Sequence, residues 1–408
     1  MTDFVPLRVV SDVNWVGVND TETERFEGLW EIPEGVSYNS YLVIGSKKKA
    51  LIDSVLKRYE VEHLEKIRRL IDPSSIDYII LNHMEPDHTG AVPRLLELAP
   101  EAQVVLTPIA LNILQHLYHI EPKTVIVKGD DVSIDLGDKT LRFIPTPWLH
   151  WPETMSSYLV DQKILFSCDA FGSFKSLPEG AIIEADLENI HEYMRSASRK
   201  YFAGVFSEKR EWVLKALKKF ADLGIEPEML APSHGPLYKF NANEIMNLWS
   251  SWSRPDFVKK VVVAYGSMYG MTVKFVEAII EGIEEAGGKA VVFDLSEKVP
   301  IDVLSEVLDA PALMVGSATY ERDVFPKVKQ FLSLLELKKL SDRLAGVFGS
   351  YGWSGEGTRK LAEQLVSMGF RLVGKPIAVL GSPLQEDLEK AKVLAKTVAQ
   401  TAFSERGL

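Results

Sequence analysis

The chain has 408 residues, a net charge of −11 and a single cysteine, Cys168. This length exceeds one ordinary hydrophobic core and predicts two domains. The acidic charge argues against a nucleic-acid partner, because binding to phosphates requires basic residues. One cysteine excludes a disulfide, a four-cysteine rubredoxin centre and an iron–sulfur cluster within the chain. Neither a signal peptide nor a membrane-spanning run is recognisable, so we expect a cytoplasmic protein.

The first part of the chain contains short strands, a few helices and many turns. Strands are predicted at residues 7–10, 16–18, 38–44, 49–53, 78–81 and 103–106, and helices at 61–70, 92–98 and 110–117. Further strands are predicted at 124–127, 139–144, 157–160, 164–167 and 229–231, and helices between 185 and 222. Strands followed by helices and a last strand predict a layered sheet sandwich with outer helices over residues 1–252.

A turn-rich segment around residues 250–257, which contains Pro255, predicts the linker between the two domains. Beyond it, apolar strands alternate with amphipathic helices, which is the pattern of a doubly wound parallel sheet. We therefore expect an α/β domain over residues 258–408. Its strands are predicted at 260–265, 290–294, 312–316, 344–349, 371–373 and 377–380, and its helices at 273–286, 303–309, 324–335, 357–368 and 388–403.

Residues 83–88 read His-Met-Glu-Pro-Asp-His and directly follow the apolar strand at 78–81. Unpaired charge at the end of such a strand costs free energy unless something compensates it. A cation shared by imidazole and carboxylate ligands provides that compensation. For a single histidine, a structural role is the more common one, but this dense cluster favours a metal site. Its candidate ligands are His83, Glu85, Asp87 and His88.

Three more candidate ligands stand at strand ends or in loops further along the chain. His150, Asp169 and His234 each follow an apolar run and precede a turn, as a ligand carried at a sheet edge would. The remaining four histidines lie in helical or charged contexts. We predict surface or capping positions for these four, which are His63, His116, His119 and His191.

A second constellation follows the first strand of the α/β domain. Residues 265–272 read Tyr-Gly-Ser-Met-Tyr-Gly-Met-Thr, a turn that offers N–H groups, hydroxyls and a helix N-terminus to a phosphate. Similar turns also cap helices without any ligand. Two further loops, 316–320 and 350–355, leave the same carboxyl edge of the sheet, where open α/β sheets bind ligands. Their aromatic rings suit a flat, stacked ligand. Uncharged loops and the absence of Gly-x-Gly-x-x-Gly favour FMN over a dinucleotide.

The order and spacing of the seven candidate ligands resemble the metallo-β-lactamase fold, whose first motif is normally His-x-His-x-Asp-His. With the domain that follows, the chain resembles the flavodiiron family, also called A-type flavoproteins, over essentially its whole length. Segments 38–42, 150–155 and 349–355 fit the same family. The resemblance implies an α+β, metallo-β-lactamase-like αββα sandwich followed by a flavodoxin-like, doubly wound α/β domain.

On this resemblance, two irons are bound per chain. His83, Glu85 and His150 would hold one, Asp87, His88 and His234 the other, and Asp169 would bridge them. Glu85 replaces the middle histidine of the motif, and its hard anionic oxygen moves the preference from zinc towards iron or manganese. The counterpart of His83 does not bind metal in every member of the family, and water would replace it if it turned away. Cys168 is expected to be a small buried thiol and not a ligand.

The loop at 265–272 resembles the flavodoxin phosphate loop, in which Ser267, Tyr269 and Thr272 with the intervening amides would hold the FMN phosphate. Gly266 and Met271 stand where relatives often carry Asp and Asn, and we expect both changes to be tolerated. The candidate FMN-binding residues are Ser267, Met268, Tyr269, Gly270 and Thr272, then Ser317, Ala318, Thr319 and Tyr320, and finally Ser350, Tyr351, Gly352, Trp353, Ser354 and Gly355.

A flavin and two irons together predict an oxidoreductase that acts on a diatomic molecule. Four electrons reduce O2 to water, and two couple two NO molecules into N2O, while the protein supplies placement. We expect O2, NO or both as the substrate, and the sequence does not fix the choice, because both use the same ligands. The family implies a head-to-tail homodimer or a dimer of dimers and an external electron donor, such as rubredoxin or a reduced cofactor such as F420H2. Trp151 and Tyr193 are candidates for the wall of the diatomic pocket, with core packing as the alternative.

Two alternatives remain open at this point. A zinc-dependent hydrolase with an appended flavodoxin-like docking domain would prefer histidine at position 85 and would need no flavin. A flavodoxin-type electron carrier would use the first domain only as a scaffold. A scaffold has no need to bury seven charged or polar ligand side chains, which costs free energy. Metal analysis and a visible spectrum separate these alternatives from a flavodiiron enzyme.

Overall fold

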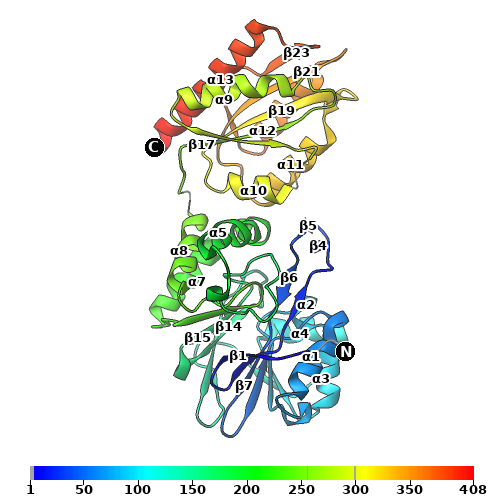
Figure 1. The fold of residues 1–408 in the computed structure, drawn as a ribbon, viewed down its shortest axis with the longest axis vertical. Helices are drawn as coiled ribbons and strands as arrows, with labels where there is room; N and C mark the ends of the chain where they lie inside the picture. The colour runs from blue at the N-terminus through cyan, green and yellow to red at the C-terminus, as the bar shows by residue number, and fades with distance from the viewer. Residues whose placement is uncertain (1–3, 255, 298–299) are drawn as a thin grey trace. The chain divides into compact units, whose positions relative to one another are not determined.

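The computed structural model describes residues 4–254, 256–297 and 300–408 (Figure 1). The chain divides into two compact units, Met1–Ser253 and Arg254–Leu408, and each is described by itself. Within this division we keep 1–252 and 258–408 as the proposed limits of the two domains.

The first unit contains two large sheets. In the first sheet, strands β1, β2, β7 and β8 are antiparallel, and β8 to β11 are parallel. Its order is β1 (Leu7–Val10), β2 (Val13–Trp15), β7 (Tyr41–Ile44), β8 (Lys49–Ile52), β9 (Tyr78–Ile80), β10 (Gln103–Leu106) and β11 (Thr124–Ile126). The order of the second sheet is β12 (Ser133–Asp135), β13 (Thr140–Pro145), β14 (Met155–Leu159), β15 (Ile164–Cys168) and β16 (Met229–Pro232).

One hydrophobic core joins the inner faces of these two sheets. Ile52 and Ile80 of the first sheet belong to the same buried cluster as Phe143 and Phe166 of the second. Figure 1 shows helices on both outer sides, with α1, α3 and α4 beside the first sheet and α5, α7 and α8 beside the second. The predicted αββα sandwich is therefore confirmed. The helices are α1 (Glu60–Arg68), α2 (Pro86–Thr89), α3 (Val92–Leu98), α4 (Pro108–Tyr118), α5 (Ile190–Tyr193), α6 (Arg199–Tyr201), α7 (Arg210–Asp222) and α8 (Ala242–Ser253).

Two strands predicted in this unit are interrupted in the structure. The predicted strand 16–18 covers the break between β2 and β3 (Val18–Asp20) and overlaps β3 only at Val18. The predicted strand 38–44 is divided into β6 (Val36–Tyr38) and β7. Strands β3 and β6 pair in a small separate ribbon, as do β4 (Arg25–Phe26) and β5 (Trp30–Glu31). Alternating apolar residues continue across these breaks, so the pattern alone does not reveal where the chain leaves one sheet for another.

The segment predicted as a turn-rich linker begins inside a helix. Helix α8 continues through Ser253, and its residues Trp249 and Trp252 are both buried. Three-residue spacing places both indoles on one helix face, and their burial outweighs the turn preference of the serines between and after them. Pro255 lies outside the described residues.

The second unit is a doubly wound parallel sheet, as predicted. Its strand order in sequence terms is 2-1-3-4-5, the flavodoxin-like order. The strands are β18 (Lys289–Asp294), β17 (Lys260–Gly266), β19 (Ala312–Tyr320), β21 (Leu344–Tyr351) and β22 (Arg371–Leu372), with β20 (Asp323–Val324) beside β19 and β23 (Ile377–Leu380) beside β21. The helices are α9 (Val276–Glu285), α10 (Pro300–Val307), α11 (Pro326–Leu337), α12 (Glu356–Ser367) and α13 (Gln385–Arg406).

This unit has a hydrophobic core of its own. Val263, Met314 and Phe348 from the central strands pack with Ile279 of α9 and Val398 of α13. Figure 1 shows α9 and α13 side by side on one face of the sheet, with α10 and α11 on the other. A separate core indicates that this unit holds its fold without help from the first.

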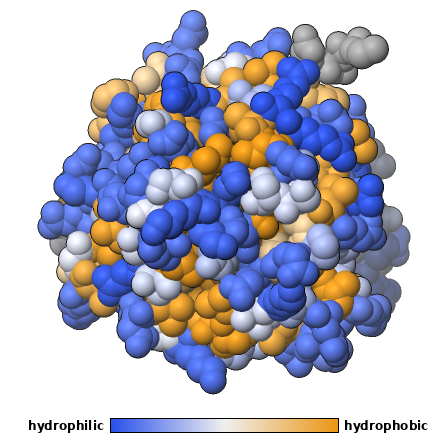
Figure 2. Space-filling model, turned by 90° about the horizontal axis from the view of Figure 1, so that it is seen from below, coloured by the Kyte–Doolittle hydropathy of each residue, from blue (hydrophilic) through white to orange (hydrophobic). Residues whose placement is uncertain are grey.

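Figure 2 shows one face, on which hydrophobic patches are separated by hydrophilic side chains. Among the described residues, the helices are all too short or too polar to span a lipid bilayer.

Candidate metal centre and flavin site

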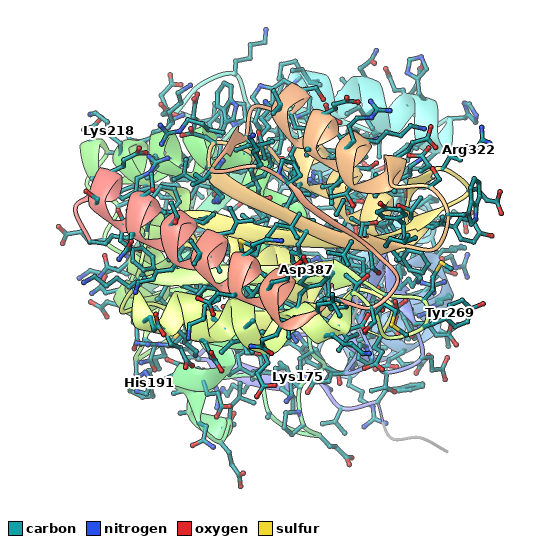
Figure 3. All side chains as sticks on the ribbon, turned by 90° about the horizontal axis from the view of Figure 1, so that it is seen from above. Lys175, His191, Lys218, Tyr269, Arg322 and Asp387 are labelled. Carbon is teal, nitrogen blue, oxygen red and sulfur yellow. The ribbon has the colours of Figure 1, made fainter. Side chains whose placement is uncertain are left out.

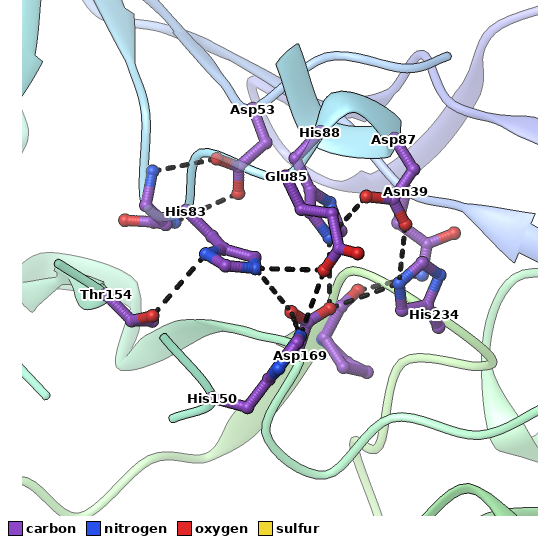
Figure 4. A network of polar contacts seen from close by, with 12 residues as sticks. Asn39, Asp53, His83, Glu85, Asp87, His88, His150, Thr154, Asp169 and His234 are labelled. Atoms are coloured by element: carbon purple, nitrogen blue, oxygen red, sulfur yellow. Dashed lines mark hydrogen bonds and ion pairs between the residues drawn. The ribbon is translucent and has the colours of Figure 1, made fainter. Parts of the chain in front are cut away.

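The seven candidate metal ligands lie together at one edge of the two sheets of the first unit (Figure 4). Strands β13, β15 and β16 run in one direction, so the segments that follow them reach the same edge. These segments carry His150, Asp169 and His234, respectively. The segment after β9 carries His83 and Glu85 and continues into α2, which contains Asp87 and His88.

The ligand atoms form two groups, in each of which they lie within 4.8 Å of one another. One group is His83, Glu85, His150 and Asp169, and the other is Asp87, His88 and His234. Asp169 faces both groups: its Oδ2 lies 3.4 Å from His150 Nε2 and 3.5 Å from His83 Nε2. Its Oδ1 lies 3.0 Å from His88 Nε2 and 3.1 Å from His234 Nε2. One carboxylate thus joins two sets of donors.

Many of these donor atoms are buried without a partner in hydrogen-bond geometry within the described part of the chain. They include both carboxylate oxygens of Asp87 and Asp169 and the Nε2 atoms of His88 and His234. Each unsatisfied buried polar atom costs about 1–3 kcal/mol, so their concentration at one place destabilises the fold unless a ligand binds there. Imidazole nitrogens and hard carboxylate oxygens are donors suited to iron and manganese. The residues therefore fit a two-metal centre.

The carboxylates reverse the effect of burial on the histidines. Burial by itself lowers a histidine pKa, but the nearby carboxylates of Asp169 and Glu85 raise the pKa of His150 to about 9. Against the same effect of burial, Asp169 and Asp87 raise the pKa of His234 to about 10. Burial would raise the pKa of Asp169, yet the neighbouring histidines hold it well below its usual value. The carboxylates of the site thus favour protonated, positively charged histidines. A bound metal would replace the protons on these histidines.

The neighbouring loops hold His234 in place. Its Nδ1 donates to the carbonyl of Ser37 at 2.7 Å, so Nε2 faces the other ligands. The side-chain amide of Asn39 donates to the carbonyls of Pro232 and Gly235, both at 2.8 Å, and so fixes the loop on either side of His234. Contacts of this kind orient metal-binding histidines and set which nitrogen is available.

Two carboxylates hold His83 in place. Its Nδ1 donates to Glu153 Oε1 at 2.7 Å, and its Nε2 lies 3.3 Å from Glu85 Oε2. The residue before it, Asn82, donates its backbone N–H to Asp53 Oδ1 at 2.8 Å. Asp53 is buried, which raises its pKa to about 6. In this structure His83 points into the centre together with Glu85.

The aromatic residues around the centre differ in how closely they approach it. The ring of Trp151 stands edge-on to His83, with 5.0 Å between ring centroids. The hydroxyl of Tyr193 contacts Ser173 Oγ at 2.9 Å and the carbonyl of Phe174 at 3.2 Å, so it anchors the loop that follows Asp169.

The sequence analysis missed Tyr201, which is completely buried and lies 5.6 Å from His234 between ring centroids. Its hydroxyl has no hydrogen-bond partner among the described residues. Burial, and then the charges of Asp169 and Asp87, raise its pKa well above the ordinary value. Tyr201 lies between two π-helical segments, Met194–Ser198 and Phe202–Phe206, a distortion frequent at functional sites. In the sequence it looks like any apolar helix position.

The other residues considered from the sequence have structural environments. Cys168 lies near His88 and Asp169, but burial raises the pKa of its thiol well above the usual value, so the neutral form is held. Of the four histidines set aside, the prediction for His63 is wrong. It is fully buried, and its Nδ1 contacts the carbonyl of Val16 at 2.8 Å.

The three predicted FMN loops lie at the carboxyl ends of neighbouring strands β17, β19 and β21. Their large rings are exposed: Tyr269 by 84%, Trp353 by 70% and Tyr320 by 46%. Figure 3 shows Tyr269 pointing outwards on the same side of the molecule as Arg322. The guanidinium of Arg322 lies 5.4 Å from the ring centroid of Trp353. Exposed rings on loops at one sheet edge fit a flat ligand that covers them.

The polar residues of these loops support one another. The Gly270 N–H donates to Ser267 Oγ at 3.1 Å, and the buried hydroxyls of Thr272 and Ser350 lie 2.9 Å apart, which joins the first loop to the third. The Thr319 hydroxyl is buried and finds no hydrogen-bond partner among the residues that the structure describes. The remaining predicted residues are also on this edge. Met268 is 40% exposed, whereas Ser317 and Ala318 are buried. Gly355 packs against the Tyr351 ring, Gly352 has open space where a Cβ atom would lie, and the Ser354 hydroxyl donates to Glu356.

The structure explains why glycine stands at position 266. A Cβ atom there would lie 2.6 Å from Phe325 Cδ1 and 2.8 Å from Val328 Cγ2. Both contacts are far below van der Waals distance, so any larger residue requires the side chains of Phe325 and Val328 to shift. In this chain, Gly266 allows Phe325 and Val328 to pack closely against strand β17.

Comparison with known proteins gives the same two-part pattern. Residues 36–235 match the family described as ODP family beta lactamase, and residues 263–393 match flavodoxin. The nitric oxide reductase of Moorella thermoacetica is 31% identical over 397 residues, which are 97% of this chain and 98% of the relative. The rubredoxin-oxygen oxidoreductase of Megalodesulfovibrio gigas is 31% identical over 396 residues, 96% of this chain and 97% of the relative.

Solved structures agree over the whole length. The rubredoxin oxygen:oxidoreductase from Desulfovibrio gigas superposes with a TM-score of 0.93 at 29% identity, covering 99% of this chain and 100% of that one. The flavodiiron protein from Giardia intestinalis gives a TM-score of 0.92 at 26% identity, covering 98% of this chain and 97% of that one.

Proposed function

Because the chain belongs to the flavodiiron family, also called A-type flavoproteins, we propose that it is an oxidoreductase acting on O2, NO or both. In this proposal O2 is reduced to water and NO to N2O at a diiron centre that receives its electrons through FMN. The names of the relatives, which include nitric oxide reductase and rubredoxin-oxygen oxidoreductase, support both substrates.

The observation that carries the proposal is the pair of donor groups joined by Asp169. In the proposal, His83, Glu85 and His150 hold one iron, Asp87, His88 and His234 hold the other, and Asp169 is shared. Two irons held side by side would supply electrons to a diatomic molecule. The chain's own part is to fix the ligands, to exclude bulk water through burial, and to hold donors such as the Tyr201 hydroxyl nearby.

We propose that the three loops of the second unit hold FMN. The phosphate would be bound by the N–H groups and hydroxyls of the loop that contains Ser267, Tyr269 and Thr272, and the flavin ring would lie against exposed Tyr269, Tyr320 and Trp353. The strand order supports this, because ligands of such sheets bind where the order reverses, here between β17 and β19.

We further propose an assembly and an electron donor. A head-to-tail homodimer, alone or paired into a dimer of dimers, would bring the flavin of one chain to the irons of the other. An isologous contact of this kind is the commonest symmetry in oligomers. The donor would be a separate rubredoxin or a reduced cofactor such as F420H2. The name of the Megalodesulfovibrio gigas relative supports rubredoxin.

The test combines composition with turnover. Protein purified without oxygen is assayed for iron, zinc and flavin, and then for consumption of O2 and NO after chemical reduction. We expect two irons and one FMN per chain, with turnover of at least one gas. In D169A we expect loss of iron and turnover while FMN is retained, because Asp169 faces only the metal groups. Zinc-loaded, flavin-free protein that hydrolyses an ester or amide would contradict the proposal.

A further inference from the structure

Glu153 is a buried carboxylate that touches the candidate metal centre without belonging to the ligand set. Its side chain has no exposed surface. Its Oε1 accepts from His83 Nδ1 at 2.7 Å and from the Met84 backbone N–H at 3.1 Å. Its own carbonyl accepts from the Thr107 hydroxyl at 2.9 Å. The residue is therefore fixed at both its backbone and its carboxylate.

The contact with Glu153 determines which nitrogen of His83 faces the centre. A carboxylate only accepts hydrogen bonds, so Nδ1 must carry a proton. This leaves Nε2, which lies 3.3 Å from Glu85 Oε2 and 3.5 Å from Asp169 Oδ2. A histidine whose second nitrogen donates to a carboxylate keeps one tautomer and one ring orientation and is a stronger metal ligand.

A purely structural role does not account for Glu153. The Met84 N–H needs only a neutral acceptor, whereas an ionised carboxylate is expensive to bury. The second oxygen, Oε2, is buried without a partner among the described residues. Thr154 Oγ1 and the Trp151 ring also approach His83, at 3.5 Å and at 5.0 Å between centroids, but neither carries a charge. His83 is the ionisable neighbour hydrogen-bonded to this carboxylate.

We propose that Glu153 is a positioning residue that makes His83 a metal ligand. It holds the Nδ1 proton and aims Nε2 at the metal that Glu85 and His150 also bind. The inference rests on the proposed function, because it requires a metal in this group. Without Glu153 the imidazole is free to turn away, and solvent would occupy its place.

The experiment uses full-length protein loaded anaerobically with Fe(II), and it compares E153A, H83A and the double variant. Iron per chain, the rate of iron loss to a chelator and the Mössbauer spectrum are measured. We expect E153A to weaken the binding of one iron by about 10- to 100-fold, the range for residues that orient a ligand. The double variant should lose iron no faster than H83A, because both substitutions remove the same ligand.

The matched control is E184Q. Glu184 is also a buried carboxylate, and it accepts from the backbone N–H groups of Phe240 and Asn241 without touching a candidate ligand. Iron loss from E184Q should proceed at the wild-type rate. If E153A does not fold, E153L replaces it. Leucine fills a similar volume but has no atom that accepts from Nδ1, and faster loss of one iron from it supports the proposal.

Two results would overturn the proposal while leaving the proposed function intact. One is an E153A (or E153L) protein with the wild-type iron-loss rate and spectrum. The other is a double variant whose iron loss is faster than that of H83A by the full E153A factor. Wild-type protein that takes up no iron would overturn both proposals at once, so the two failures are distinguishable.

Discussion

Glu85 is the residue that most changes the chemistry of the first motif. Its side chain is 18% exposed, whereas those of His83, His88, Asp169 and His234 are at most 1% exposed. It therefore combines a hard oxygen donor with the most open position in the cluster. A small molecule entering the centre from solvent would pass this side chain.

We expect E85H to move metal selectivity towards zinc. Imidazole suits zinc better than a carboxylate does, whereas hard oxygen donors favour iron. Apoprotein is loaded anaerobically from an equimolar mixture of Fe(II) and Zn(II), and bound metals are measured after gel filtration. The zinc-to-iron ratio should be higher in E85H than in the wild type. An unchanged ratio would show that position 85 does not set the preference.

The buried His63 gives a prediction about pH that is independent of the metal. Burial lowers its pKa to about 4 from the ordinary 6.5. Between these values the unfolded chain binds a proton that the folded chain excludes. The contribution of neutral, buried His63 to the unfolding free energy is therefore complete above pH 6.5 and is lost as the pH falls through 4. The difference between the two pKa values corresponds to about 3 kcal/mol of unfolding free energy.

The matching experiment is denaturant unfolding of the wild type and H63Q across this pH range. From pH 4 to 6.5 the unfolding free energy should rise by about 3 kcal/mol more in the wild type than in H63Q, since glutamine does not titrate there. Parallel pH profiles would mean that His63 has an ordinary pKa in the folded chain.

The elements show which parts of the site can be predicted from sequence. Ligands that directly follow an apolar strand are visible, because a charged cluster at that point has no packing role. Glu153 is not visible in this way, because it follows a short turn and its partner His83 is distant in sequence. Strands β19 and β21 continue to Tyr320 and Tyr351, through residues predicted as loops. Their ends pair with β20, which follows β19 directly, and with β23, and pairing with a neighbouring strand overrides local glycine content.

At the same scale, the exposed rings of the loops can be tested directly. We expect W353A to bind FMN about 3- to 10-fold more weakly, because an aromatic stack contributes about 0.5–1.5 kcal/mol. The measurement is the recovery of flavin fluorescence on dilution. L337A is the control, since Leu337 is similarly exposed, at 66%, but ends α11. Equal affinities in W353A and the wild type would place the flavin elsewhere.

For the whole molecule, two separate cores predict two separable activities. Residues 254–408, expressed alone, should fold and bind FMN without iron, because their sheet and core are complete. Residues 1–253 should bind iron without flavin, since all seven candidate ligands lie there. Circular dichroism, metal analysis and flavin titration check both. If residues 254–408 were unfolded in isolation, the two units would not be independent.

The measurement that tests the central claim most directly is the electron count of the fully reduced chain. The anaerobic protein is titrated with dithionite and then mixed with O2, and hydrogen peroxide is assayed. A flavin and two irons acting together should take up four electrons per chain and convert one O2 to water without releasing peroxide. Uptake of only two electrons, followed by release of one hydrogen peroxide per chain, would contradict the account, because a flavin alone produces that result.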